Sequence, residues 1–113
     1  MTEKKTVIEF PLSVKSAKTI IQDLAEHHSS SIKLSSHCRQ RMRERGVTIR
    51  QIFQVLKCPH SQMTEEPHQT AAGSWKFNLK GFASGDRVEV VIDLKNSEYD
   101  PSAYLVTVII KEF

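Results

Sequence analysis

Cysteine, glycine and proline are all scarce in this chain. Its 113 residues include only two cysteines, four glycines and four prolines. Two cysteines are too few for a disulfide scaffold, so we expect Cys38 and Cys58 to be reduced thiols in a cytoplasmic protein. The glycines lie apart from any strand-to-helix turn, which argues against a glycine-rich phosphate-binding loop.

Long apolar runs are also missing. No stretch approaches the roughly 20 apolar residues that cross a bilayer, and residues 1–10 precede no apolar run of the kind found in signal peptides. The sequence therefore predicts no membrane partner. Its 39% hydrophobic and 26% charged residues are ordinary for one soluble domain with a modest core.

Positive charge gathers in one part of the chain. Residues 33–57 contain seven lysines and arginines and one glutamate, whereas the whole chain has a net charge of only +3. Such asymmetry is typical of a protein with a polyanionic or acidic partner. The alternative is a helical face that is simply solvated.

The centre of this basic region, residues 36–46, is predicted to form one short helix. A serine can cap its start, and Gly46 stands where a left-handed C-cap is needed. His37, Arg41 and Arg45 are four residues apart, so their side chains form one row, which we call the cationic row. Like charges in a row destabilise a bare helix, which indicates a bound anion, either a carboxylate of this protein or a phosphate from outside.

The row beside it is the part of this helix expected to be buried. Cys38 and Met42 are its apolar members, and Cys38 is interpreted as a buried structural thiol. The cationic row then lies along the edge of the face that packs on the core, while Arg39 and Arg43 point outward.

The first part of the chain predicts a strand followed by a helix. Residues 5–10 fit a short strand, and Ser13 can cap a helix that runs to about His27 with a stripe of apolar residues. Three consecutive serines, residues 29–31, then interrupt the pattern.

These serines divide the chain into an N-terminal extension, residues 1–30, and a main domain, residues 31–113. The extension is expected to pack on the main domain or on a second copy of the chain. In the second case it would form a homodimer.

A second helix follows the basic one. Thr48 begins it, its apolar residues recur at the i, i+3, i+4 and i+7 positions of a buried face, and Pro59 ends it. Because the link between the two helices is short, they are expected to form a helical hairpin or an L-shaped pair.

After Pro67 the period of the pattern changes from 3.6 to 2 residues, which predicts strands. Three strands are expected around residues 75–80, 87–94 and 104–110, with a five-residue turn at 81–85. The sequence therefore predicts an α+β fold in which a helical pair packs on a small antiparallel sheet.

Two aromatic residues could serve as platforms for RNA bases, Trp75 and Tyr104, but both are in phase with core residues, so their burial is expected.

The cationic row has the groups needed to cleave RNA without a metal. The reaction needs a base for the ribose 2′-hydroxyl, an acid for the leaving oxygen and cations for the charge that builds at phosphorus. An imidazole titrates near neutral pH, so His37 suits the base or the acid. Arg41 and Arg45 suit the third duty because a guanidinium holds phosphate with two parallel hydrogen bonds. A lone histidine near a helix start can instead be a capping or core residue.

Histidine and cysteine are frequent enough to raise the question of a metal. Cys58-Pro59-His60 holds one pair of ligands, but no two pairs have zinc-finger spacing and no HExxH occurs. We therefore expect neither a metal nor another cofactor.

Taken in order, these residues resemble the domain of unknown function 4258 over about residues 34–110. The residues that carry the resemblance are His37, Arg41, Met42, Arg45, Gly46, Val47, Thr48, Ile52, Leu56 and Pro59, then the tryptophan strand, residues 88–92 and residues 105–108. That family is grouped with the RelE-type toxins of bacterial toxin-antitoxin systems. Their fold is a small antiparallel sheet backed by helices, and most cleave messenger RNA without a metal and are inhibited by an antitoxin protein.

The resemblance implies a RelE-like domain, an RNA substrate and an antitoxin partner. Its matching positions are His37, Arg41 and Arg45 as catalytic residues, with Thr107 in the last strand. Further candidates for contact with RNA are Arg39, Lys76 and Arg87. The alternative is a module without catalytic activity whose basic helix docks an acidic protein or a nucleic acid, and residues 64–66, with two glutamates, could then neutralise the cationic row internally.

Overall fold

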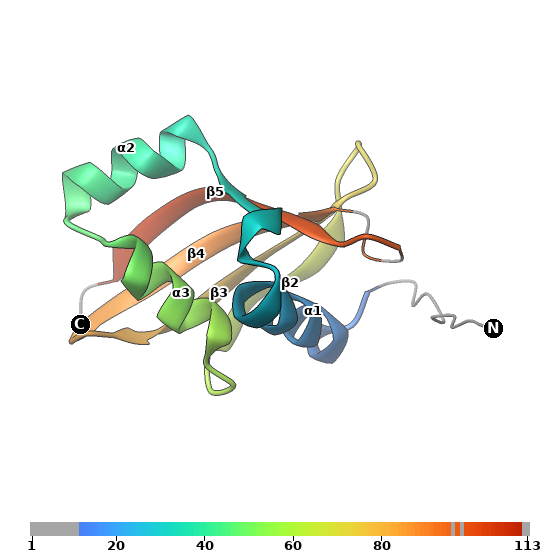
Figure 1. Ribbon diagram of the computed structural model, residues 1–113, viewed down its shortest axis with the longest axis horizontal. Helices are drawn as coiled ribbons and strands as arrows, with labels where there is room; N and C mark the ends of the chain where they lie inside the picture. Colours follow the sequence, from blue (N-terminus) through green and yellow to red (C-terminus); the bar gives the residue numbers. More distant parts are fainter. Residues whose placement is uncertain (1–11, 96, 98, 112–113) are drawn as a thin grey trace.

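In the part of the chain that the structure describes, five strands form one sheet and three α-helices pack around it (Figure 1). The structure is a computed structural model, and it describes residues 12–95, 97 and 99–111. In chain order the elements are α1 (Val14–His27), a short 3-10 helix η1 (Ser29–Ser31), β1 (Ile32–Leu34), α2 (Ser36–Arg45), α3 (Ile49–Lys57), β2 (Gln62–Gln69), β3 (Trp75–Ala83), β4 (Asp86–Lys95) and β5 (Ser102–Lys111).

The sheet is mixed, with the strand order β1-β5-β4-β3-β2. β1 runs parallel to β5, and the other neighbours are antiparallel. The predicted α+β class is confirmed and the three predicted strands pair antiparallel, but the sheet as a whole has five strands and is mixed, not the small antiparallel sheet that was predicted. Three residues of β1 are too few to show an alternating pattern, and most side chains of the edge strand β2 are exposed, so neither strand has a strong signature in the sequence.

The three predicted strands are β3, β4 and β5. The turn between β3 and β4 is shorter than predicted, because Ala83 pairs with Asp86 and leaves only Ser84 and Gly85 between the strands. Both turn residues have positive φ values, 53° and 88°, as a tight two-residue hairpin requires. Phe82, which was predicted to lie in the turn, therefore belongs to β3.

The N-terminal helix agrees with the prediction. Ser13 caps α1 by accepting a hydrogen bond from the backbone N–H of Ser16 at 3.1 Å, and the helix ends at His27. Buried residues of α1, among them Ala17 and Ile21, belong to the same hydrophobic core as the sheet. The strand predicted for residues 5–10 lies outside the described residues.

A lysine ties α1 to the loop that precedes β2. The ammonium group of Lys18 donates hydrogen bonds to the carbonyl oxygens of Pro59, at 2.9 Å, and Ser61, at 2.7 Å. α1 also contacts α3 and β2, so it packs on the rest of the chain as the first of the two predicted alternatives. The homodimer stays a prediction.

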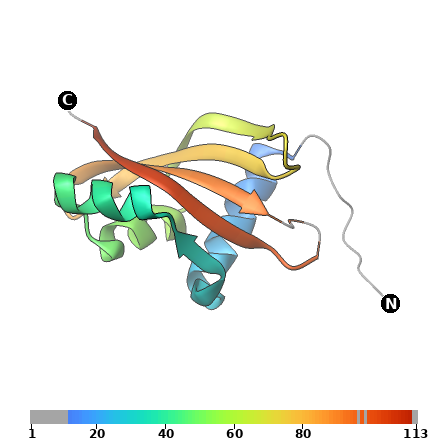
Figure 2. The ribbon, with the colours of Figure 1, turned by 90° about the horizontal axis from the view of Figure 1, so that it is seen from above.

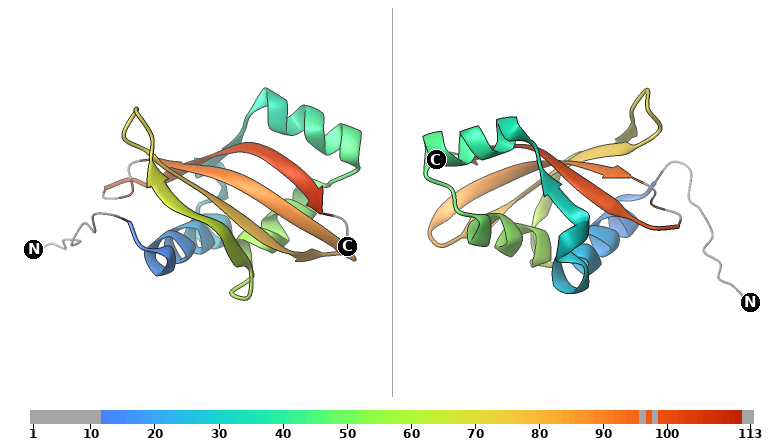
Figure 3. Two further views of the ribbon diagram at one scale, coloured as in Figure 1. Left: turned by 180° about the vertical axis from the view of Figure 1, so that it is seen from behind. Right: turned by 45° about the horizontal axis from the view of Figure 1, so that its top comes forward.

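The two helices of the predicted hairpin pack on different parts of the sheet. α2 lies beside β5, as Figure 2 shows, whereas α3 contacts β3 and β4. The predicted hairpin or L-shaped pair is therefore not confirmed. Seen from behind, the sheet lies in front of α1 and α3, and no described helix covers that face (Figure 3).

Alternation along the strands separates the two faces of the sheet. Phe77, Val90 and Leu105 are fully buried on the helix side. Within each strand, the residues that alternate with these buried ones point to the other face. That uncovered face therefore carries most of the polar side chains of β3 and β4.

Candidate nucleic-acid interface

The start of α2 is attached to the sheet by one serine. Ser35 is the N-cap, and its hydroxyl oxygen accepts a hydrogen bond from the backbone N–H of Cys38 at 2.8 Å. The same hydroxyl donates to the carbonyl of Val106 at 2.7 Å, and the backbone N–H of Ser35 donates to the carbonyl of Leu105 at 3.0 Å. These bonds hold the basic helix against β5.

The end of α2 has the predicted glycine cap. Gly46 has a φ of 69°, in the left-handed region, and its N–H bonds to the carbonyl of Met42. Arg43 and Arg45 occupy the last turn, where the negative end of the helix dipole stabilises cations. This interaction lowers the cost of placing like charges together on one short helix.

The inward row of α2 is the predicted one. Cys38 is fully buried, and Met42 is half-buried and packs against the core. The cationic row lies at the border of this buried strip: His37 and Arg45 are exposed and Arg41 is half-buried. The structure thus places all three predicted catalytic residues on one accessible helix.

One carboxylate reaches the cationic row among the described residues. Arg41 Nη1 lies 3.4 Å from Glu44 Oε1, with both side chains partly exposed. Gln40 also donates a hydrogen bond to Glu44, at 2.9 Å. An exposed pair of this kind contributes little stability, so Glu44 leaves most of the positive charge of α2 uncompensated.

The glutamates of β2 do not neutralise the row. β2 and β5 are separated by β3 and β4 in the sheet, which places their backbones roughly 14 Å apart. α2 packs on β5 and so lies at the far side of the sheet from β2. Glu65 instead lies 3.9 Å from His68 on its own strand. The internal neutralisation considered for residues 64–66 is therefore wrong.

The other predicted RNA contacts do not form one cluster. Arg39 is exposed on α2, while Lys76, Arg87 and Thr107 are partly exposed on the uncovered face of the sheet. Lys76 pairs with Asp93 and Arg87 is six residues earlier on β4, so they are roughly 20 Å apart along the strand. The structure therefore does not bring Lys76 and Arg87 together.

The two aromatic residues considered as platforms have different environments. Trp75 is buried, as predicted, with 8% of its surface exposed, whereas Tyr104 is 40% exposed and lies under Lys95. The predicted burial of Tyr104 is wrong because the neighbours Ala103 and Leu105 take the core positions. β5 is apolar on both faces, so its sequence did not reveal which face is inside.

A third aromatic residue was missed by the sequence reasoning. Phe82 is 66% exposed near the end of β3. A signal was present, because Phe82 continues the alternation of Lys76, Asn78 and Lys80, which are the outward positions of this strand. Phe82 is thus an exposed aromatic side chain on a face that is otherwise largely polar.

The thiol of Cys38 should make the protein less stable in alkaline solution. Burial raises the pKa of Cys38 above its ordinary value of 9.0, and the nearby Arg39 guanidinium lowers it to a smaller extent. The Cys38 thiol therefore loses its proton at a lower pH in the unfolded chain than in the folded one. Below the pKa of the unfolded state the free energy of unfolding does not depend on this thiol's ionisation. As pH rises from the unfolded-state pKa through the folded-state pKa, the free energy of unfolding falls. Urea unfolding at pH 7.5 and 10 should show a smaller alkaline decline in Cys38→Ala than in the native chain.

The matched control for this experiment is Cys58→Ala, which keeps Cys38 and should retain the native decline. Equal declines in all three proteins would contradict the role of Cys38.

No group of three metal-binding side chains occurs within residues 12–95, 97 and 99–111. Cys58 and His60 lie in the loop after α3. Nor does any described helix have the length and apolar character needed to cross a membrane.

Fold and surface together define a small α+β protein with a basic helix beside one edge of a mixed sheet. Residues 34–110 match the domain of unknown function DUF4258, and the chain belongs to this family, as predicted. No curated protein and no solved structure matches the chain significantly.

Proposed function

We propose that this protein is a toxin-like, RNA-binding protein of the RelE type that cleaves RNA without a metal ion. Its partners would be RNA and an antitoxin protein that inhibits it. One observation carries this proposal: α2 has five basic side chains, four of them exposed, and a single acidic one. The basic residues are His37, Arg39, Arg41, Arg43 and Arg45, and the acidic residue is Glu44.

The dimensions of α2 suit a phosphate backbone. His37 and Arg45 are eight residues apart, which corresponds to about 12 Å along a helix. In duplex DNA each strand carries one phosphate per roughly 3.4 Å of helix axis, and a row of about 12 Å is long enough to contact more than one phosphate of a strand. Phosphate contacts of this kind give affinity without reading base sequence.

The chemistry follows from the residue types in the row. His37 would take the proton of the 2′-hydroxyl or donate one to the leaving oxygen. Arg41 and Arg45 would stabilise the negative charge that develops at phosphorus. The half-burial of Arg41 supports this assignment, because a partly sheltered cation interacts more strongly with a bound anion than a fully solvated one.

Binding of single-stranded RNA at several salt concentrations tests the proposal. Replacing Arg41 and Arg45 with glutamine should weaken binding and reduce the slope of log affinity against log salt by about 1.4, because each lost phosphate contact accounts for about 0.7. Fluorescence anisotropy with a labelled oligonucleotide measures both quantities.

The double variant Lys15→Gln/Lys57→Gln is the matched control, since it removes two exposed cations from α1 and α3. It should keep the native slope. If both double variants reduced the slope equally, binding would depend on net charge and not on α2.

A second candidate function is a binding module without catalytic activity. The observation in its favour is that the cationic row contains one imidazole for two proton transfers, and that Arg41 is already paired with Glu44. Such a module would use the same helix to dock an acidic protein or a nucleic acid. Retained RNA binding without any cleavage would favour it.

A further inference from the structure

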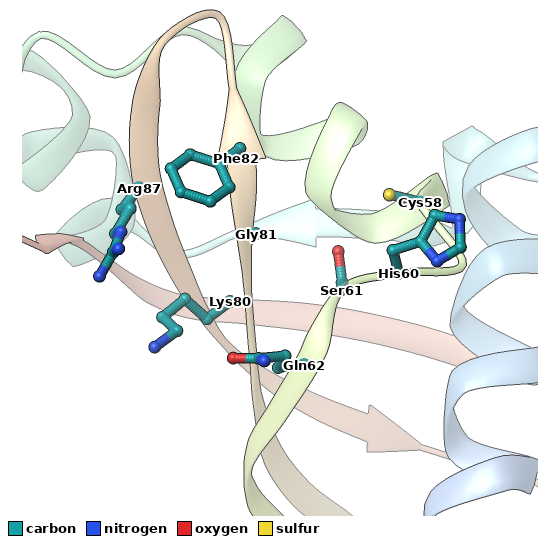
Figure 4. A pocket seen from close by; sticks show the side chains of 8 residues that line it. All are labelled: Cys58, His60, Ser61, Gln62, Lys80, Gly81, Phe82 and Arg87. Carbon is teal, nitrogen blue, oxygen red and sulfur yellow. The ribbon is translucent and has the colours of Figure 1, made fainter.

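A second basic surface lies near the edge of the sheet that is far from α2, where β3 extends beyond β2. The last residue pair of these strands is Gln62 with Lys80, so residues 81–83 of β3 have no partner in β2. A pocket of about 440 Å³ opens at this edge. It is lined by Cys58, His60, Ser61, Gln62, Lys80, Gly81, Phe82 and Arg87 (Figure 4).

Close packing at the base of the pocket shows that its shape is built into the fold. A Cβ atom on Gly81 would lie 2.8 Å from the hydroxyl oxygen of Ser61, closer than atoms can pack. Ser61 is buried, and its hydroxyl donates a hydrogen bond to the carbonyl of Val55 at 2.7 Å. Because Ser61 is held this close to β3, a side chain at position 81 would have to displace it.

The lining combines cations with an aromatic ring and contains no carboxylate. In Figure 4 Phe82, Lys80 and Arg87 extend from the β3–β4 hairpin, and His60 lies across from them on the loop after α3. The guanidinium carbon of Arg87 lies 5.3 Å from the centre of the Phe82 ring, against one face of it. Because Phe82 is 66% exposed, ring surface remains for another planar group.

The two nearest acidic residues of the hairpin accept hydrogen bonds from uncharged side chains. The Asp86 carboxylate accepts a hydrogen bond from Gln51 at 2.8 Å. Glu89, which pairs with Lys80 across the strands, accepts hydrogen bonds from Thr64 and Asn78, both at 2.8 Å. Among the described residues Lys80 forms no ion pair, so its ammonium group can contact a phosphate.

We propose that this pocket binds a nucleoside monophosphate unit, either as a free nucleotide or as one unit of an RNA strand. The base would stack on Phe82, and the phosphate would lie near Lys80 and Arg87. Aromatic rings beside basic side chains bind nucleotides in this way with little base preference. A volume of about 440 Å³ is within the range of small-molecule sites. The proposal does not depend on α2, which packs on β5, two strands away from β3.

Calorimetric titration of the full chain with adenosine 5′-monophosphate (AMP) tests the site. Phe82→Ala should weaken binding roughly 5- to 100-fold, as expected for loss of one stacked base, and Lys80→Gln should weaken AMP more than adenosine. Tyr99→Ala is the matched control, because Tyr99 is an exposed aromatic residue outside the pocket. Phe82→Ala should still fold, because the ring that it removes is exposed and does not belong to the core.

Cys58 offers a second, independent measurement. It lines the pocket and is half-buried, whereas the chain's other cysteine, Cys38, is fully buried. Saturating AMP should therefore slow the reaction of Cys58 with iodoacetamide, and Phe82→Ala should abolish this protection.

Two further measurements distinguish a free nucleotide from an RNA strand and distinguish the pocket from α2. A single-stranded tetranucleotide that displaces AMP from the pocket would identify an RNA strand as the ligand, whereas AMP binding without competition would identify a free nucleotide. Arg41→Gln should leave AMP affinity unchanged, so failure of the α2 proposal would not affect this one. Absence of AMP binding at millimolar concentration, or equal affinity in Phe82→Ala and the native chain, would overturn the proposal.

Discussion

Replacing His37 or Arg41 with alanine should abolish cleavage of single-stranded RNA. Loss of a general acid or base costs about 10² to 10⁴ in rate, and loss of one group that stabilises a developing negative charge costs about 10² to 10³. His37 is exposed and Arg41 half-buried on α2. The melting temperature should therefore remain within a few degrees of native. Cleavage of end-labelled RNA on a gel, with a chelator present, measures the rate.

Arg43→Ala is the control for that experiment. Arg43 is an exposed arginine of the same helix, but it does not belong to the cationic row. Its removal should leave most of the cleavage rate. If His37→Ala and Arg41→Ala cleave as fast as the native protein, the catalytic site is elsewhere. If the native protein binds RNA and does not cleave it, the module without catalytic activity is the correct function.

Replacing Gln51 with alanine should cause a large loss of stability. Its buried side chain donates hydrogen bonds to the carbonyl of Ala83, at 3.0 Å, and to Asp86, at 2.8 Å, and accepts one from the backbone N–H of Thr48. The change would break the capping box of α3 and remove the hydrogen bonds from Gln51 to the carbonyl of the buried Ala83 and to Asp86. We expect a loss of about 3 kcal/mol in the free energy of unfolding and a melting temperature roughly 10 °C lower or more.

Gln54→Ala on the same helix is the matched control. Gln54 is exposed, and among the described residues its side chain accepts one hydrogen bond, from the hydroxyl of Ser84 at 3.3 Å. Its melting temperature should be close to native. Thermal unfolding followed by circular dichroism compares the two variants. Similar small shifts for both would show that the contact between α3 and the β3–β4 turn contributes little.

Much of the candidate interface could be read from local spacing. The cationic row, the buried position of Cys38 and the cap at Gly46 all follow from the period of one helix and the backbone freedom of glycine. The strands β3, β4 and β5 followed in the same way from alternation, although the phase of Tyr104 did not.

The surroundings of α2 could be learned only from the tertiary structure. The sequence left open whether Glu65 neutralises the row, and only the strand order places β2 at the far edge from β5. The pocket at Phe82 has the same origin, because His60 of the α3–β2 loop and Arg87 of β4 are distant in sequence and line one pocket only in the folded chain.

By itself, the sequence determined the class of the fold, most of the individual helices and strands, and the line of charge along α2. These features depend on residues a few positions apart, whose spacing decides which side of a helix or strand they occupy. The tertiary structure decided the parallel pairing of β1 with β5, the separation of acidic and basic groups, and the assembly of the nucleotide pocket. Those depend on the pairing of distant segments, which is selected by the packing of the whole core and has no local pattern.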